Sequence, residues 1–307
     1  MFISVIIPNY NHAPFLNERI DSVLNQTYSN FEVIILDDKS KDNSREIIES
    51  YRKNEKVTHI EFNSENSGST FKQWKKGLDL AKGEWIWIAE SDDIADVNFL
   101  QTMVNQIESN TGIVFCRSNL IDENKEPITL YNFTSMPDLT VYNQFSSDFN
   151  MEGDEYTKKF MLNMNSIPNA SSAIFKKSLV KPSILIEAGK TRLFGDWLFW
   201  LHLLKQAKIS YVLQPYNYFR FHQNTVRKDT LHSSTRLMEY TVLVKYLESE
   251  FKLSAEALDC LVYLYLSGDI PRSKLKLSEH IKLNIFILKR NPKLLLKSYY
   301  RKLSKKA

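Results

Sequence analysis

Hydrophobic positions in the first part of the chain follow two alternating periods. Short, nearly continuous apolar runs rich in β-branched residues predict buried strands at 3–7, 31–36, 57–62, 85–89 and 112–116. Apolar residues spaced by three and four positions predict helices at 13–26, 44–51, 69–81 and about 96–108. Because strands alternate with helices of this length, we expect an α/β fold in which helices flank a mainly parallel sheet.

Clusters of polar residues follow four of these strands. The first cluster begins at Asn9, the second is Asp37-Asp38, the third lies after residue 62 and the fourth is 90–93. Parallel strands end at a common edge of the sheet, and ligands of α/β proteins bind there. The sequence therefore predicts a binding site that is built from all four clusters.

The periodicity changes in two later regions. Residues 118–160 are polar and aromatic with weak periodicity, which predicts a long loop or insertion that can act as a functional lid. From about residue 230 the pattern is helical to the end of the chain. We therefore expect an α/β domain over residues 1–228 and a helical extension over residues 229–307.

Charge is distributed unevenly along the chain. The net charge is +4, but residues 270–307 hold twelve Lys or Arg and one acid, so this tail carries +11 and the rest carries −7. A basic amphipathic tail suits an anionic membrane surface, and the alternative is a basic face packed on the acidic body. A nucleic-acid partner is not expected, because the body offers no element that reads one.

Composition indicates a cellular location. The N-terminus lacks a charged segment followed by an apolar core, and no stretch reaches the roughly 18 to 20 apolar residues of a membrane span. The two cysteines, Cys116 and Cys260, have neither disulfide-framework nor zinc-site spacing. These features predict a cytoplasmic protein, and the basic tail adds a peripheral position at the inner face of the cell membrane.

Acidic residues are the strongest sign of chemistry. Glu90, Asp92 and Asp93 are three acids within four residues, and their mutual repulsion favours a divalent cation that carries a diphosphate. The alternative is a helix N-terminus, where acids are stabilised by the dipole. Asp37-Asp38 is compatible with a ligand contact or with an ordinary turn. Neither G-x-G-x-x-G nor G-x-x-x-x-G-K-[ST] occurs, which argues against hydride transfer and P-loop chemistry.

Five short motifs together resemble family 2 glycosyltransferases, enzymes with the Rossmann-like GT-A fold, of the type that builds bacterial surface polysaccharides. In chain order they are Pro8-Asn9-Tyr10-Asn11, Asp37-Asp38, Asn66-Ser67-Gly68, Glu90-Ser91-Asp92-Asp93 and Gly195-Asp196-Trp197. The resemblance covers roughly residues 1–222. It implies a GT-A domain over residues 1–228, with 118–160 as an acceptor loop.

The resemblance also implies roles for individual residues. Those implied to bind the nucleotide-sugar donor are Pro8, Asn9, Tyr10, Asp38, Asn66, Gly68 and Asp92. Asp93 and His222 would hold Mg²⁺ or Mn²⁺ on the donor diphosphate, and a purely structural histidine is the alternative for His222. Asp196 would be the general base that activates the acceptor hydroxyl, or else an N-cap of the helix that follows it. Residues implied near the acceptor are Asn169, Ser171 and Trp197.

The implied reaction is the metal-dependent transfer of one sugar, with inversion, from a nucleotide-diphosphate donor to a saccharide or polyprenyl-linked saccharide hydroxyl. UDP is expected as the nucleotide from family frequency alone. The Q-x-x-R-W motif of processive polymerases is absent, and Glu90 stands where Asp is usual.

Two other functions compete with this interpretation. A nucleotidylyltransferase would require a Gly-rich basic loop after the first strand. A non-catalytic nucleotide-sugar or carbohydrate-binding relative would keep Asp38 and Asp93 without needing Asp196 as a base.

Overall fold

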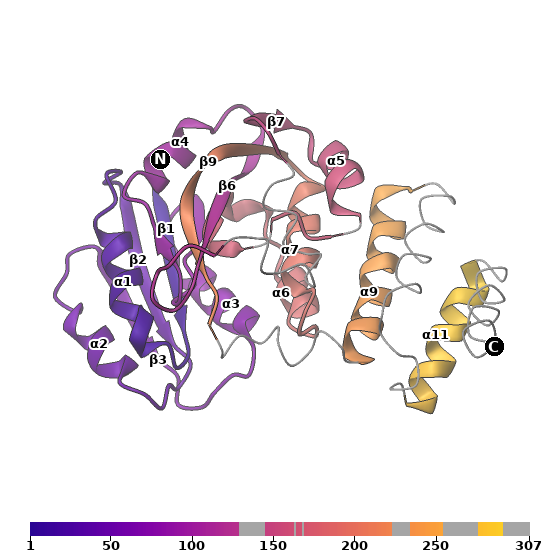
Figure 1. Ribbon diagram of the computed structural model, residues 1–307, viewed down its shortest axis with the longest axis horizontal. Coiled ribbons are helices and arrows are strands. Elements are labelled where there is room, and N and C mark those ends of the chain that lie inside the picture. Colours follow the sequence, from indigo (N-terminus) through magenta and orange to yellow (C-terminus); the bar gives the residue numbers. More distant parts are fainter. Residues whose placement is uncertain (129–144, 163, 168, 223–233, 254–275, 291–307) are drawn as a thin grey trace. The chain divides into compact units, whose positions relative to one another are not determined.

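A computed structural model of the chain describes residues 1–128, 145–162, 164–167, 169–222, 234–253 and 276–290 (Figure 1). The chain divides into two compact units. The first contains Met1–Lys190 and Phe199–His222, and the second contains Thr191–Leu198 and Gln223–Ala307. The boundary between residues 228 and 229 stays a prediction. In the structure, the short segment 191–198 groups with the C-terminal part of the chain.

One sheet forms the centre of the first unit. Its strands within the described residues are β1 (Ile3–Asn9), β2 (Phe31–Asp37), β3 (Val57–Phe62), β4 (Trp85–Ile88), β5 (Ile94–Ala95), β6 (Thr111–Ile121), β7 (Phe149–Met151), β8 (Ala173–Lys176) and β9 (Lys208–Arg220). Their order is β3-β2-β1-β4-β8-β6-β9-β5, with β7 also paired to β9. The pairs among β3, β2, β1 and β4 are parallel, as is β6 with β9. The expected α/β fold with a parallel central sheet is confirmed, whereas β8 runs antiparallel to both its neighbours.

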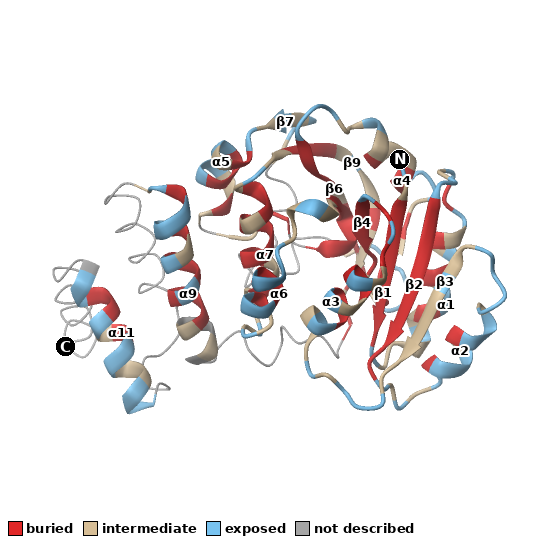
Figure 2. Cartoon of the chain, turned by 180° about the vertical axis from the view of Figure 1, so that it is seen from behind, coloured by how far each residue is buried: buried red, intermediate tan, exposed pale blue. Residues whose placement is uncertain are grey.

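Helices flank this sheet (Figures 1 and 2). Those of the first unit are α1 (Ala13–Leu24), α2 (Ser44–Ser50), α3 (Thr70–Leu80), α4 (Phe99–Asn105), α5 (Gly153–Tyr156) with the π-helical turn Thr157–Met161, the 3₁₀ turns Ala170–Ser172 and Lys177–Leu179, and α6 (Pro182–Ala188). The residues of helix α7 (Gly195–Leu204) are divided between the two units after Leu198, and α9 (Ser234–Phe251) and α11 (Leu277–Arg290) belong to the second.

Strand β1 shows why the predicted strands are apolar on both faces. Ile3, Val5 and Ile7 pack in one cluster with apolar residues of α1, α2 and α4. Ile6 lies on the opposite face against α3, where a Cβ on Gly77 would come within 2.4 Å of Ile6 Cγ2. Successive side chains of a strand point to opposite faces, so a strand that is covered on both sides needs an uninterrupted apolar run. Figure 2 shows this burial along β1 and β2, in contrast to the edge strand β3.

The region expected to be a loop at 118–160 contains strands and a helix among its described residues. Strand β6 continues to Ile121, because it keeps pairing with β9 as far as Arg220. Strand β7 and α5 also fall in this region, and residues 129–144 lie outside the described part. The helical character of the C-terminal extension is confirmed for α9 and α11, while residues 254–275 and 291–307 lie outside it. Among the helices that the structure describes, none has the length and hydropathy of a membrane span.

Candidate active site

The polar clusters after β1 and β2 meet at the carboxyl edge of the sheet. Asn9 Nδ2 donates to Asp37 Oδ2 at 2.8 Å and to Ser40 Oγ at 3.1 Å. The backbone N–H of Asp38 donates to the carbonyl of Asn9 at 2.9 Å. Asn9 is 2% exposed, so these contacts fix the two loops relative to each other. The expected convergence of these clusters is confirmed, and for Asn9 a contact with the donor stays a prediction.

Asp38 organises the loop that follows β3. Its Oδ1 accepts from Asn63 Nδ2 at 2.6 Å, Ser67 N at 2.8 Å and Gln73 Nε2 at 2.8 Å. Its Oδ2 accepts from Ser67 Oγ at 2.8 Å, and the side chain is 5% exposed. Both carboxylate oxygens are therefore committed to protein donors. Asp38 as an acceptor for the nucleobase stays a prediction, and ordering of this loop is the role that its contacts support.

The remaining predicted donor residues lie in the same loops. Asn66 Nδ2 donates to the carbonyl of Asp38 at 3.1 Å, and Asn66 Oδ1 accepts from Gly68 N at 2.8 Å. Gly68 has a φ of 69°, a region that favours glycine. Pro8 is buried within β1, whereas the ring of Tyr10 is 41% exposed. The exposed ring of Tyr10 is therefore a surface on which a planar base can stack.

Glu90 opens the acidic cluster after β4. Its Oε1 accepts from Trp74 Nε1 at 3.0 Å, and its backbone N–H donates to Ser171 Oγ at 3.0 Å. Burial, with the negative charges of Asp92 and Asp93 adding to it, raises the pKa of Glu90 to about 8. The side chain is therefore mostly protonated at neutral pH unless a positive charge is bound nearby.

Asp93 is enclosed by protein donors. Its Oδ1 accepts from Arg220 N at 3.0 Å, and its Oδ2 accepts from Asn169 Nδ2 at 2.9 Å and lies 3.7 Å from Arg19 Nη2. The residue is 1% exposed, and burial with the charge of Asp92 raises its pKa to about 6. As a metal ligand Asp93 stays a prediction, and a cation would first have to displace these donors.

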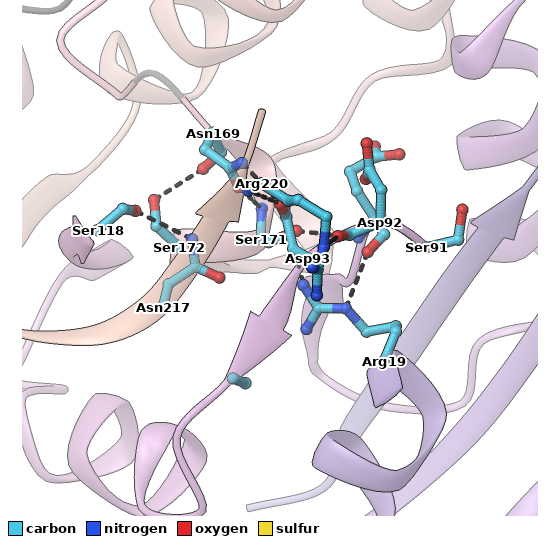
Figure 3. A network of polar contacts seen from close by, with 12 residues as sticks. Arg19, Ser91, Asp92, Asp93, Ser118, Asn169, Ser171, Ser172, Asn217 and Arg220 are labelled. Atoms are coloured by element: carbon cyan, nitrogen blue, oxygen red, sulfur yellow. Dashed lines mark hydrogen bonds and ion pairs between the residues drawn. The ribbon is translucent and has the colours of Figure 1, made fainter. Parts of the chain in front are cut away.

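Two buried arginines brace the acidic cluster (Figure 3). Arg220 Nε donates to the carbonyl of Asp92 at 2.8 Å, and its Nη2 donates to Glu18 Oε2 at 2.7 Å. Arg19 Nε donates to the carbonyl of Glu90 at 2.8 Å. Both side chains are almost fully buried. Arg19 comes from α1 and Arg220 from the end of β9. Together they hold the backbone carbonyls of Glu90 and Asp92 in place.

Asp92 faces two histidines. His222 Nε2 lies 3.0 Å from Asp92 Oδ2, and the rings of His12 and His222 are 5.3 Å apart. One ligand atom from each of the three residues falls within 4.8 Å of the others, which is compatible with a shared metal ion. Burial lowers the pKa of His12, which favours the neutral imidazole that a metal requires. Burial would raise the pKa of Asp92, but the His222 hydrogen bond, and the positive charge of either imidazole when it is protonated, outweigh it and keep that pKa low.

Ser91 adds an orienting contact to this group. Its Oγ lies 2.8 Å from His12 Nδ1, which leaves Nε2 of the ring as the potential ligand atom. Metal-binding histidines commonly bond through their other nitrogen in this way. The sequence predicted His222 but missed His12, because only the fold brings the β1–α1 loop beside residues 91 and 92. A polar residue in that loop was the only signal available.

Asn169 and Ser171, expected near the acceptor, are hydrogen-bonded to residues of the acidic cluster. Asn169 Oδ1 accepts from Ser171 N at 2.7 Å, while Asn169 Nδ2 holds Asp93. The carbonyl of Ser171 accepts from Trp87 Nε1 at 2.8 Å. Both residues are buried, at 6% and 0% exposed. A contact with the acceptor stays a prediction for both, and positioning of residues 90–93 is what their hydrogen bonds support.

Asp196 and Trp197 belong to the second unit. Asp196 is the second residue of α7, half-buried, and its Oδ1 accepts from Trp197 N at 2.8 Å. Trp197 is 4% exposed and its ring lies 5.7 Å from that of Phe194. An acid in the first turn of a helix is stabilised by the helix dipole. The base and acceptor roles of these residues stay predictions.

Comparison with protein-family models identifies one match. The model for glycosyl transferase family 2 matches residues 4–178, which include β1 to β4, the acidic cluster and β8.

Individual relatives agree in type. Glycosyltransferase GlyG of Streptococcus pneumoniae is 38% identical over 112 residues, 36% of this chain and 37% of GlyG. The GalNAc(5)-diNAcBac-PP-undecaprenol β-1,3-glucosyltransferase of Campylobacter jejuni is 24% identical over 83% of this chain and 76% of its own length. The part of this chain that aligns with GlyG thus spans well under two thirds of the length of GlyG. The alignment with the Campylobacter protein spans 76% of that protein's length.

A solved structure shares the fold. The crystal structure of TarS residues 1–349 from S. aureus, in complex with UDP-GlcNAc, superposes with a TM-score of 0.68 at 19% identity. The match covers 96% of this chain and 83% of that chain.

Proposed function

Because this chain belongs to glycosyl transferase family 2, we propose that it is an inverting, metal-dependent glycosyltransferase. It transfers one sugar from a nucleotide-diphosphate donor to a hydroxyl of a saccharide or lipid-linked saccharide. The observation that carries the proposal is the grouping of His12, Asp92 and His222 at the carboxyl edge of the sheet, inside the α/β domain that the family match covers in large part.

The same three residues are proposed to hold the divalent cation. Two imidazoles and one carboxylate are a donor set that Mn²⁺ accepts readily, whereas Mg²⁺ prefers oxygen ligands alone. This donor set therefore favours Mn²⁺ over Mg²⁺. Asp92 is the proposed carboxylate ligand because it lies beside both histidines. The oxygens of Asp93 instead accept hydrogen bonds from protein donors. A bound cation supplies positive charge that stabilises the negative charge on the leaving diphosphate. Arg19 and Arg220 act on the protein side, because they hold the backbone that presents Asp92.

Asp196 is proposed as the general base. It takes the proton from the acceptor hydroxyl as that oxygen forms a bond to the anomeric carbon. The bond between the anomeric carbon and the diphosphate oxygen breaks at the same time, and its electron pair leaves with the nucleoside diphosphate. One displacement on the face opposite the leaving group inverts the configuration at the anomeric carbon.

The relatives support the substrate classes. TarS is described in complex with UDP-GlcNAc, and the Campylobacter relative is named for a polyprenyl-diphosphate-linked oligosaccharide that it glucosylates. We therefore propose a UDP-sugar as donor and a lipid-linked or polymeric saccharide as acceptor. A non-catalytic sugar-binding relative is the second possibility, and it would share the donor site without using Asp196.

The proposal predicts metal-dependent nucleotide binding. We expect one nucleotide among UDP, GDP, CMP and dTDP to raise the melting temperature by about 5 °C at 100 times its Kd when Mn²⁺ is present, since a ligand that binds only the folded state stabilises it. ADP serves as the control that separates base recognition from simple diphosphate binding. No rise with any nucleotide at millimolar concentration, for protein shown to be folded, would contradict the donor site.

A membrane surface is the proposed location of action. Helix α11 exposes Leu277, Ile281, Ile285 and Leu288, each at 47% or more, while Leu283 and Ile287 on its other side are buried. The exposed residues recur every three or four positions and thus form one apolar stripe. Lysines at 276, 282 and 289 accompany it, and the basic residues of 291–307 lie outside the described part. An apolar stripe with basic neighbours fits the interface of an anionic bilayer.

Vesicle binding tests this location. We expect the protein to sediment with phosphatidylglycerol vesicles and not with phosphatidylcholine vesicles. Replacing Ile281 and Ile285 by Ser should weaken the partitioning tenfold or more, because burying one such side chain contributes about 2 kcal/mol. Ile186→Ser, which alters an exposed isoleucine on α6, is the matched control and should bind normally. Equal binding of the double variant and the parent protein would contradict the role of α11.

A further inference from the structure

A buried carboxylate of the C-terminal extension holds the segment that precedes Asp196. Glu239 of α9 is 8% exposed. Its Oε1 accepts from Arg192 N at 2.6 Å, and its Oε2 accepts from Leu193 N at 2.8 Å and Phe194 N at 3.2 Å. Three successive backbone N–H groups therefore converge on one side chain. Hydrogen bonds to an ionised acceptor are about twice as strong as neutral ones, so this is a firm anchor.

Aromatic contacts reinforce the same connection. The ring of Phe194 lies 6.1 Å from that of Tyr240, the residue after Glu239 on α9, and 5.7 Å from that of Trp197 on α7. Phe194 is also the residue whose carbonyl accepts from Leu198 N in the first turn of α7. Glu239 and Tyr240 thus fix the backbone on which α7 begins, and Asp196 is only two residues beyond the anchored Phe194.

We propose that Glu239 is a positioning residue for Asp196, so that the C-terminal extension takes part in the reaction through the second unit. This inference rests on the proposed role of Asp196 as base. Without the carboxylate, the N–H groups of 192–194 lose their common acceptor and the start of α7 can shift. A displacement of about 1 Å in a reacting group can lower turnover 10²-fold, so a modest shift is sufficient.

The test is Glu239→Gln, with turnover followed as nucleoside diphosphate released from the donor that the binding screen selects. Glutamine keeps the size of the side chain but has one acceptor oxygen and turns an N–H₂ group toward the backbone donors. We expect kcat to fall by about 10- to 100-fold with the Kd for the nucleotide unchanged. Glu250→Gln, at an exposed position of the same helix, is the control and should match the parent protein. If Glu239→Gln does not fold, Glu239→Asp, which keeps the charge but shortens the reach, takes its place.

A double variant separates positioning from general stabilisation. If Glu239 acts through Asp196, adding the Glu239 substitution to Asp196→Asn should cause no further loss of kcat, because the base is already absent. An equal further loss in that background would overturn the proposal, as would normal kcat with only a lowered melting temperature. If Asp196→Asn itself keeps normal turnover, the proposed base is wrong, and that failure is distinct from a failure of Glu239.

Discussion

Replacement of Asp196 by Asn is expected to lower turnover by about 10²-fold or more while nucleotide binding stays unchanged, the usual scale for loss of a general base. The amide oxygen of Asn can still accept the hydrogen bond that Asp196 Oδ1 receives from Trp197 N at 2.8 Å, so the start of α7 should persist. The substitution removes the negative charge and the ability to take a proton, while it keeps this hydrogen-bond acceptor. Release of nucleoside diphosphate and calorimetric binding of the nucleotide measure the two quantities separately.

Asp154→Asn is the matched control for this experiment. Asp154 also lies in the first turn of a helix, α5, and its partner is Lys205 at 3.4 Å. We expect its turnover to equal that of the parent protein. Normal turnover in Asp196→Asn would show that another group, or none, removes the acceptor proton, and a non-catalytic sugar-binding function would then become the better account.

Replacement of Asp92 by Asn is expected to weaken Mn²⁺ binding by about 10²-fold or more. Altering even a residue that only hydrogen-bonds to a metal ligand typically lowers metal affinity about 10- to 100-fold. Turnover should fall with it, since charge on the leaving diphosphate loses its stabilisation. Titration of free Mn²⁺ by electron paramagnetic resonance measures the affinity without any substrate. His12→Ala should weaken binding in the same direction if His12 is a ligand.

Asp93→Asn decides between the two carboxylates. The sequence predicts Asp93 as the ligand, whereas in the structure its oxygens accept hydrogen bonds from Arg220 N and Asn169 Nδ2. We expect Asp93→Asn to leave Mn²⁺ affinity within a few-fold and to lower thermal stability, because buried Arg19 loses its charge partner 3.7 Å away. Loss of Mn²⁺ binding in Asp93→Asn with normal binding in Asp92→Asn would contradict the proposed ligand set.

Strands of the sheet could be predicted from the sequence where burial on both faces requires a continuous apolar run. The apolar runs at 3–7, 31–36 and 85–89 became the buried strands β1, β2 and β4, because strands covered on both faces leave no other pattern. The run at 57–62 became β3, a partly buried edge strand parallel to β2. Strand β8 was harder to place. Its short apolar stretch indicates a strand but carries no information on direction, and it inserts antiparallel between β4 and β6 through long-range pairing.

Some residues of the candidate site could likewise be predicted from the sequence, and others could not. Acids at strand ends were visible in the sequence, because their clustering is local. The contributions of His12, Arg19 and Glu239 were not visible, because each depends on a contact between segments far apart in the chain. Asp38 and Asn169 show the converse. The family resemblance implied ligand contacts for both, but only the structure reveals that protein donors and acceptors engage their polar atoms.

Direct detection of sugar transfer tests the central claim. The protein, Mn²⁺ and the UDP-sugars of glucose, galactose and their N-acetyl forms are incubated with saccharide and polyprenyl-linked saccharide acceptors, and products are weighed by mass spectrometry. We predict that one acceptor gains the mass of a single sugar, with an equal amount of UDP released, and that Asp196→Asn reduces both to about 1% or less. If the protein is folded and binds the nucleotide but produces neither product nor UDP above the level of Asp196→Asn, the proposal that it is a glycosyltransferase is contradicted.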